Sequence, residues 1–174
     1  MQTALTRDGN WTLLLVAILI VDVVVMMFSR HTGLLGRPLN VWYDRFGLSA
    51  VISDVFIIAI GFWLARWIYT TWFAGRGLAW FLGILVIVQA IHDILFFVGV
   101  IRPFPRGLNA MMDVFKDYAA SGGAKIIAGD AGLMLASAGV FMAMERLSAP
   151  WQVAVGLLTV YALPYALTTK AVNT

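Results

Sequence analysis

The stretch from Trp11 to Ser29 reads WTLLLVAILIVDVVVMMFS, and it decides the fold class. It is long enough to cross the hydrocarbon core of a bilayer, which takes about 20 mostly apolar residues in a helix. A secretory signal peptide has a shorter apolar core, followed by small residues at a cleavage site. This stretch instead contains Asp22 and is followed by Arg30 and His31, so we interpret it as a retained transmembrane helix.

Four further runs of similar length and apolarity follow along the chain. The five predicted spans are about 11–29, 49–70, 77–101, 123–144 and 151–169. Five spans of about 20 residues use roughly 100 residues. The remainder of the 174 residues is then connecting segments, without room for a separate catalytic domain. We therefore predict an all-α membrane protein, a five-transmembrane-helix bundle that forms a single integral membrane domain over residues 1–174.

The composition agrees with this class and excludes several functions. Hydrophobic residues make up 61% of the chain and charged residues 12%, whereas a soluble domain is nearer a quarter charged. The absence of cysteine excludes disulfides, thiolate metal sites and a cysteine nucleophile. A net charge of +3 is too small and too dispersed for a nucleic-acid partner. The lipid bilayer is the expected partner, and a homo-oligomer or a larger membrane complex remains open.

Two long connections, 30–48 and 102–122, separate the predicted helices and fall on one side of the membrane, called here the long-loop face. The first contains Gly33, Gly36 and Pro38, which indicate a structured loop or a short interfacial piece. The second predicts an amphipathic helix at about 107–120 that lies in the headgroup plane. Its apolar side is formed by Leu108, Met111, Met112, Phe115, Tyr118 and Ala119.

Short turns at 71–76 and 145–150 lie on the opposite side, called here the short-loop face. Lysine and arginine favour the long-loop face, where we place Arg30, Arg37, Arg45, Arg102, Arg106, Lys116, Lys125 and Lys170. The short-loop face carries Arg7, Arg66, Arg76 and Arg146. Because positive charge accumulates in cytoplasmic loops, this asymmetry predicts a cytoplasmic C-terminus and an N-terminus outside.

Each of the first four predicted helices contains one aspartate: Asp22, Asp54, Asp93 and Asp130. Counted from the long-loop face, they lie about 7, 5, 8 and 7 residues into their helices, which is roughly 8–12 Å deep. Tyr161 of the fifth helix falls in the same layer. A carboxylate in hydrocarbon costs about 2.5–3.5 kcal/mol on insertion scales, so we expect all four to point into the bundle.

Gln89, His92 and Asp93 share one stripe of the third predicted helix. Carboxylates close together cannot all ionise without a cation, so some hold protons or are neutralised. The sequence therefore predicts an acidic intramembrane centre that binds protons or a cation and serves transport or a membrane-embedded reaction. Its predicted members are Asp22, Asp54, Asp93, Asp130, His92, Gln89 and Tyr161. A divalent cation would take Asp93, Asp130 and His92 as its metal ligands. Whether the chain is an enzyme stays open.

A purely structural role for the aspartates is the alternative. Asp54 lies near the start of its helix and could cap it, while Asp130 could pair with Lys125 and Asp22 with Arg30. Interhelical hydrogen bonds of this kind contribute about 0.6 kcal/mol each. The chain would then be a non-catalytic structural or assembly subunit of a larger membrane or virion complex. The sequence itself shows no internal repeat and none of the phosphate-loop, nucleophile-elbow or zinc-protease motifs.

Several segments carry a resemblance: WYDRFGLSAVISD at 42–54, IHDILFF at 91–97, DVFKDY at 113–118, AGD at 128–130 and YALPY at 161–165. They resemble uncharacterised polytopic membrane proteins of large DNA viruses that infect algae and other protists. The similarity covers most of the chain from about Asn40 onward. No activity belongs to that group, so the resemblance implies only a viral or host membrane as the location.

Overall fold

The computed structural model describes residues 4–6 and 9–172, and within that range every regular element is a helix. The long helices are α1 (Trp11–Thr32), α3 (Leu48–Trp72), α4 (Leu78–Phe96), α6 (Ala124–Met144) and α7 (Ala149–Thr168). The shorter elements are η1 (Ala4–Thr6), α2 (Arg37–Phe46), η2 (Phe97–Ile101) and α5 (Ala110–Gly122). The helix η2 continues α4 in a π-helical form.

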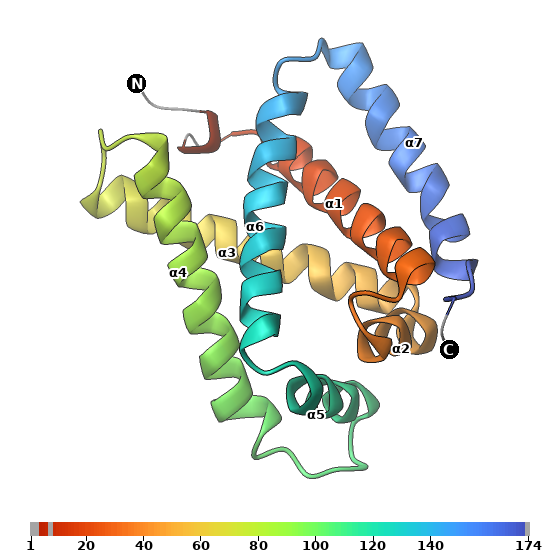
Figure 1. Ribbon diagram of the computed structural model, residues 1–174. Coiled ribbons are helices and arrows are strands. Elements are labelled where there is room, and N and C mark those ends of the chain that lie inside the picture. Colours follow the sequence, from red (N-terminus) through yellow and green to blue (C-terminus); the bar gives the residue numbers. More distant parts are fainter. Residues whose placement is uncertain (1–3, 7–8, 173–174) are drawn as a thin grey trace.

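Five helices are long and apolar enough to cross a membrane, with α4 and η2 counted together as one. The all-helical class and the five predicted apolar helices are therefore confirmed, and each predicted end lies within a few residues of the observed one. In Figure 1, the turns that lead into α4 and α7 lie toward the upper edge. The short helices α2 and α5 lie in the lower half, α7 ends on the right beside the end of α1, and α3 crosses behind α4 and α6.

The segment predicted as a structured loop or short interfacial piece forms the ten-residue helix α2. Pro38 lies in its first turn, where a missing N–H removes no helical bond. Its apolar residues follow a helical spacing of three and four, and they are Leu39, Trp42, Tyr43 and Phe46. Gly47, with φ +51°, ends α2 and starts α3 at once. A side chain is rarely tolerated at that φ, so the sharp corner requires glycine.

The predicted interfacial helix is observed as α5, capped by Asn109, whose side chain accepts bonds from the N–H groups of Met111 and Met112. Its apolar side packs on α2: the rings of Phe115 and Trp42 lie 4.7 Å apart. Val114 is the buried residue of α5. The apolar side of α5 is thus directed at least in part toward protein, and its position in the headgroup plane stays a prediction.

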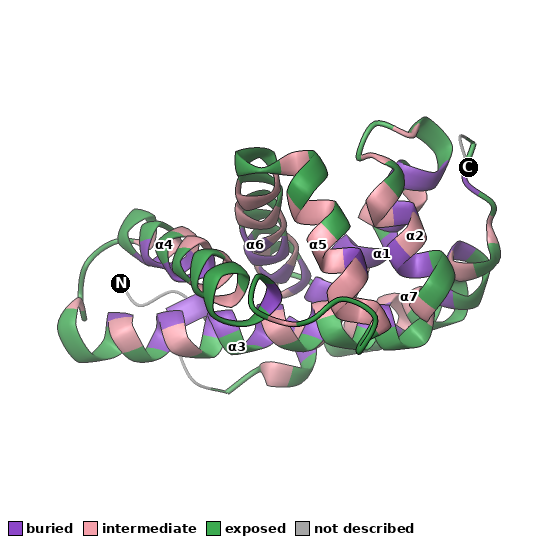
Figure 2. Ribbon diagram, turned by 90° about the horizontal axis from the view of Figure 1, so that it is seen from below, coloured by how far each residue is buried: buried purple, intermediate pink, exposed green. Residues whose placement is uncertain are grey.

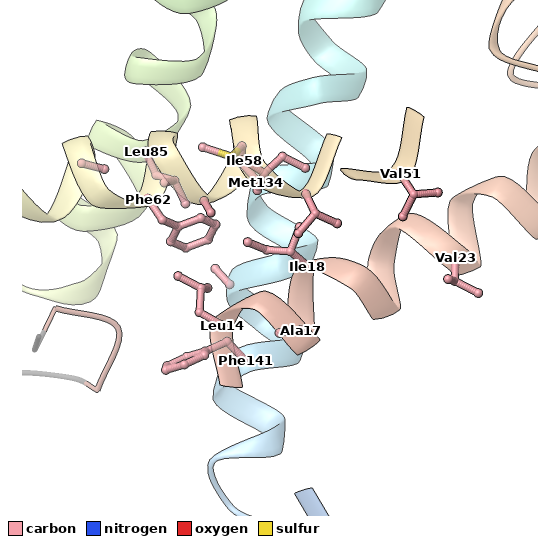
Figure 3. Close-up of a cluster of buried hydrophobic side chains, with 14 of the residues drawn as sticks. Leu14, Ala17, Ile18, Val23, Val51, Ile58, Phe62, Leu85, Met134 and Phe141 are labelled. Carbon is pink, nitrogen blue, oxygen red and sulfur yellow. The ribbon is translucent and has the colours of Figure 1, made fainter. Parts of the chain in front are cut away.

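Apolar side chains of α1, α3, α4 and α6 meet in one core (Figure 3). Phe62, Leu85 and Phe141 are completely buried there. At Gly61 the side chain of Met134 packs against the backbone of α3, because a Cβ at that position would lie 2.6 Å from the terminal carbon of Met134. Since lipid is as apolar as a protein core, close packing at small residues is what holds such helices together.

The outer surfaces of the long helices carry large apolar side chains. Figure 2 shows exposed residues along the outer sides of α3 and α4. Phe56 is 57% exposed, Leu95 64% and Leu157 66%. Soluble monomers rarely expose apolar patches that extend over several helices. This distribution suits side chains that face lipid and fits an integral membrane protein.

Candidate functional site

Asp22 is the most deeply buried of the four aspartates, with 3% of its surface exposed. The hydroxyl of Tyr43, from α2, donates a 2.7 Å hydrogen bond to its Oδ1 atom. Its other oxygen, Oδ2, is buried and has no hydrogen-bond partner among the described residues. Asp22 therefore points into the protein, with one oxygen bonded and one oxygen unbonded.

Asp54 accepts its hydrogen bond from Trp42, the residue of α2 that precedes Tyr43. The indole Nε1 of Trp42 donates to its Oδ2 atom at 2.9 Å. Asp54 does not cap α3, because Gly47 occupies the cap position and no side chain bonds there. Two adjacent residues of α2 thus close over two aspartates on different long helices.

The polar stripe of α4 holds the third aspartate. Gln89 donates from Nε2 to Oδ1 of Asp93 at 2.7 Å, and Nδ1 of His92 lies 3.2 Å from the same oxygen. The Oδ2 atom of Asp93 is buried without a partner among the described residues. The ring of His92 stacks on Phe96, with centroids 5.6 Å apart. Gln89, His92 and Asp93 therefore form one bonded group, as their spacing predicted.

Tyr118 of α5 connects these groups. Its pKa is raised to about 12, mostly by burial and then by the charges of Asp130, Asp54 and Asp93 in that order. Its hydroxyl therefore lies within electrostatic range of carboxylates from α6, α3 and α4. Burial likewise raises the pKa of Tyr43 well above its usual value, and the charges of Asp22 and Asp54 add to this effect.

Asp54 acts on both tyrosines, so the four carboxylates form one continuous set beside α2 and α5. Asp54 itself interacts electrostatically with Asp22, and Asp130 with Asp93 and Asp54. We call this set, together with Tyr43 and Tyr118, the acidic layer. Asp54 is the member that interacts with both tyrosines.

Tyr161 does not belong to the acidic layer. It is 67% exposed, and its hydroxyl lies 3.0 Å from that of Tyr165. Both tyrosines line a shallow apolar groove against Val23 and Met27 of α1. A depth shared with the aspartates was the basis for including it, but depth does not determine which way a side chain points around its helix.

The expected pairing of Asp22 with Arg30 is not observed. Arg30 is completely buried, and its Nη1 donates to Oδ1 of Asp44 at 2.7 Å. Its Nη2 donates to the carbonyl of Leu167 at 3.2 Å, one of the last carbonyls of α7. The final carbonyls of a helix have no internal donor and favour positive charge. Arg30 therefore joins α1, α2 and α7 and leaves Asp22 to Tyr43.

The predicted metal ligands Asp93, Asp130 and His92 are not gathered into a ligand set. Within residues 4–6 and 9–172, no three aspartate, glutamate or histidine side chains lie close enough to hold a metal ion. The divalent cation site therefore stays a prediction from the sequence. We do not treat these three residues as metal ligands.

The sequence did not identify Trp42, Tyr43 or Tyr118 as functional residues. Trp42 and Tyr43 lie on the apolar side of α2, whose helical spacing of apolar residues was readable from the sequence. Tyr118 was assigned to the apolar side of an interfacial helix. Each has an aromatic body suited to packing and a polar group at its tip that needs a partner when buried.

Comparisons with protein-family models, curated proteins and solved structures find no match for this chain. The viral resemblance therefore stays an expectation from the sequence.

Proposed function

We propose that this chain is a multi-pass membrane protein whose acidic layer holds protons on buried carboxyl groups. The observation that carries this proposal is the environment of Asp22. It is 3% exposed, and its Oδ2 atom is buried without a partner among the described residues. A charged carboxylate in such surroundings is costly, and the neutral acid avoids that cost.

Asp93 supports the same proposal from the other side of the layer. Its Oδ2 atom is likewise buried and unbonded within the described residues. Repulsion between neighbouring carboxylates also disfavours ionisation of all four aspartates, so we expect fewer than four negative charges in the layer.

The bonded groups favour protons over a metal ion. Trp42 and Gln89 present N–H groups to the carboxylates of Asp54 and Asp93. A cation would be repelled by these donors, whereas a proton on the free oxygen is compatible with them. His92, whose side chain is 35% exposed, is the accessible member of the group around Asp93.

Dicyclohexylcarbodiimide tests the proposal, because this apolar reagent adds to protonated carboxyl groups and leaves a stable acylurea. The purified protein in detergent is treated at neutral pH, and the modified aspartates are located by mass spectrometry. We expect modification of the buried Asp22 and little at the exposed Asp44. Absence of modification at all four aspartates of the layer, down to mildly acidic pH, would contradict the proposal.

Protons held in this way would serve transport or a membrane-embedded reaction. Asp93→Asn keeps the shape of the side chain and removes the titrating group. In vesicles, the variant is expected to lose proton uptake on a pH step while it retains the wild-type circular dichroism spectrum. An unchanged uptake would exclude Asp93 from the function.

The second candidate is a structural or assembly subunit, which the bond from Tyr43 to Asp22 favours because it joins two helices. Under this function, Asp-to-Asn changes alter only the free energy of unfolding. Proton uptake by the wild type would then equal that of empty vesicles.

A further inference from the structure

Four buried positions ahead of the aspartate are shared by α1 and α4 when Asp22 is placed on Asp93. Residues 13, 14, 17 and 18 are buried on α1. Adding 71, the separation of the two aspartates, gives residues 84, 85, 88 and 89, which are all buried on α4. The agreement is confined to this half of each helix, because α1 is also buried around Asp22 whereas the corresponding residues 92–100 are not.

Four buried positions are also shared by α3 and α6 when Asp54 is placed on Asp130, although α3 buries further residues without a buried counterpart on α6. Residues 58, 61, 62 and 65 are buried on α3. Adding 76 gives residues 134, 137, 138 and 141, which are all buried on α6. The lack of similarity between the paired letters explains why the sequence itself shows no repeat.

The corners before α3 and α6 also match. Gly47 has φ +51° and ψ −123°, and Gly123 has φ +49° and ψ −128°. Each glycine ends a short helix and starts a long one, and each is followed seven residues later by an aspartate, Asp54 or Asp130. Two identical backbone corners at matching distances from matching carboxylates are a third agreement, independent of burial.

The contacts between helices repeat as a two-fold relation requires. The helix α1 packs on α6 and α4 packs on α3, while α1 contacts α3 as α4 contacts α6. The short helices α2 and α5 pack on each other. In Figure 1, α1 and α4 both run toward the α2–α5 end, and α3 and α6 both lead away from it. These agreements point to residues 11–72 and 78–144 as two structural repeats, with α7 outside them.

The repeat assigns an equivalent to Trp42. Trp42 lies five residues before Gly47, and Tyr118 lies five residues before Gly123. Trp42 donates to Asp54, so we propose that Tyr118 is the positioning residue that donates to Asp130 when that carboxylate is charged. Among the described contacts the two are within electrostatic range without a hydrogen bond. The inference rests on the proposed function, since it assigns a donor within the same acidic layer.

The pH dependence of carbodiimide modification tests this assignment. The charged groups that face Asp130 are Asp93 and His92 of α4 and Asp54 of α3. A donor to the charged form delays protonation, so Tyr118→Phe should raise the pH at which half of Asp130 is modified by about one unit. Tyr118→Trp supplies the donor that the other repeat uses and should return the midpoint toward that of the wild type.

The corresponding substitutions of Trp42, in the other repeat, are the matched control. Asp54 is faced by Asp22 and Tyr43 as well as by Trp42. Trp42→Phe should raise the Asp54 midpoint by a similar amount, and Trp42→Tyr should restore it. The midpoint of Asp22 should stay constant in the Tyr118 variants, because its donor is Tyr43.

One result would overturn the assignment and leave the proton-holding layer in place: the modification midpoint of Asp54 shifts in Trp42→Phe, but that of Asp130 does not shift in Tyr118→Phe. A shift in Tyr118→Phe that Tyr118→Trp does not reverse would also overturn it. Absence of modification in the wild type would instead contradict the proposed function itself. If Tyr118→Phe fails to fold, the comparison of Tyr118→Trp with Tyr118→Leu gives the same decision.

Discussion

The hydroxyl of Tyr43 lies 2.7 Å from Oδ1 of Asp22, so a short helix at the end of the bundle closes over a carboxylate inside its first long helix. Both residues are buried, with 3% of each exposed. The bond makes the environment of Asp22 depend on the docking of α2. If α2 no longer packed there, the acidic layer would be exposed at that end of the bundle.

Tyr43→Phe removes this donor and should lower the free energy of unfolding by about 1–3 kcal/mol, because Asp22 is left with two unbonded oxygens. Thermal unfolding in detergent measures the change. Tyr161→Phe is the control, since its exposed hydroxyl should matter by less than about 0.5 kcal/mol. Equal losses in the two variants would mean that the Tyr43 bond contributes nothing specific.

Asp44→Asn should destabilise the protein by about 1.5–3 kcal/mol, because the completely buried guanidinium of Arg30 loses its charged partner. The control is Asp117→Asn, whose ion pair with Arg106 is exposed at both ends and should be worth less than about 1 kcal/mol. Chemical denaturation of both variants gives the comparison. A smaller effect at Asp44 than at Asp117 would argue against Arg30 as the joint between α1, α2 and α7.

Gly47→Ala and Gly123→Ala should destabilise by similar amounts, about 1–3 kcal/mol each, because both backbones adopt nearly the same left-handed conformation. An added Cβ meets nothing within 4 Å at either site, so backbone strain alone accounts for the loss. Gly83→Ala, inside α4 and equally open, should be neutral or stabilising. Markedly unequal losses at the two corners would count against the structural repeat.

Tyr118 should make stability fall at alkaline pH. Burial raises its pKa from 10.0 to about 12, so the fold favours the neutral hydroxyl. The stabilisation from this group is complete below pH 10.0 and is lost as pH rises to about 12. Tyr118→Phe should therefore lose less stability than the wild type over that interval, measured by unfolding midpoints in detergent. Parallel losses in both proteins would show that Tyr118 titrates as an exposed tyrosine does.

The two faces of the membrane can be assigned with single cysteines, since the chain has none of its own. Cysteine at Arg37 should react with an impermeant maleimide from the cytoplasmic side, and cysteine at Arg76 from the other side. Reaction of both from one side would refute the predicted topology. Arg7, which entered the charge count, lies outside the described residues.

The number, length and order of the long helices were predictable because a bilayer imposes a length and an apolarity that are read directly from sequence. The site was only partly predictable. Spacing on one helix correctly grouped Gln89, His92 and Asp93, since neighbours three and four apart share a face. Depth alone wrongly added Tyr161, because it carries no information about rotation around the helix axis.

The donors to the aspartates were not predictable from spacing. Trp42 reaches Asp54 and Tyr43 reaches Asp22 only because Gly47 turns α2 back over the long helices. That corner depends on one backbone conformation and is visible only in three dimensions. The proposed repeat was hidden for a related reason: it shares some buried positions and the two glycine corners, whereas the residues at the shared buried positions differ.

A chain of half this length, paired with its own copy, would surround the same carboxylates with two identical corners and two identical donors, as an isologous dimer does. The turn between α3 and α4 joins the halves covalently and thereby lets them differ. One donor is an indole, which only donates, and the other is a phenol, which donates and accepts. Asp22 is closed off by Tyr43, while Asp93 lies beside the partly exposed His92. If the two halves are repeats, their covalent connection lets the layer have one enclosed end at Asp22 and one more accessible end at Asp93.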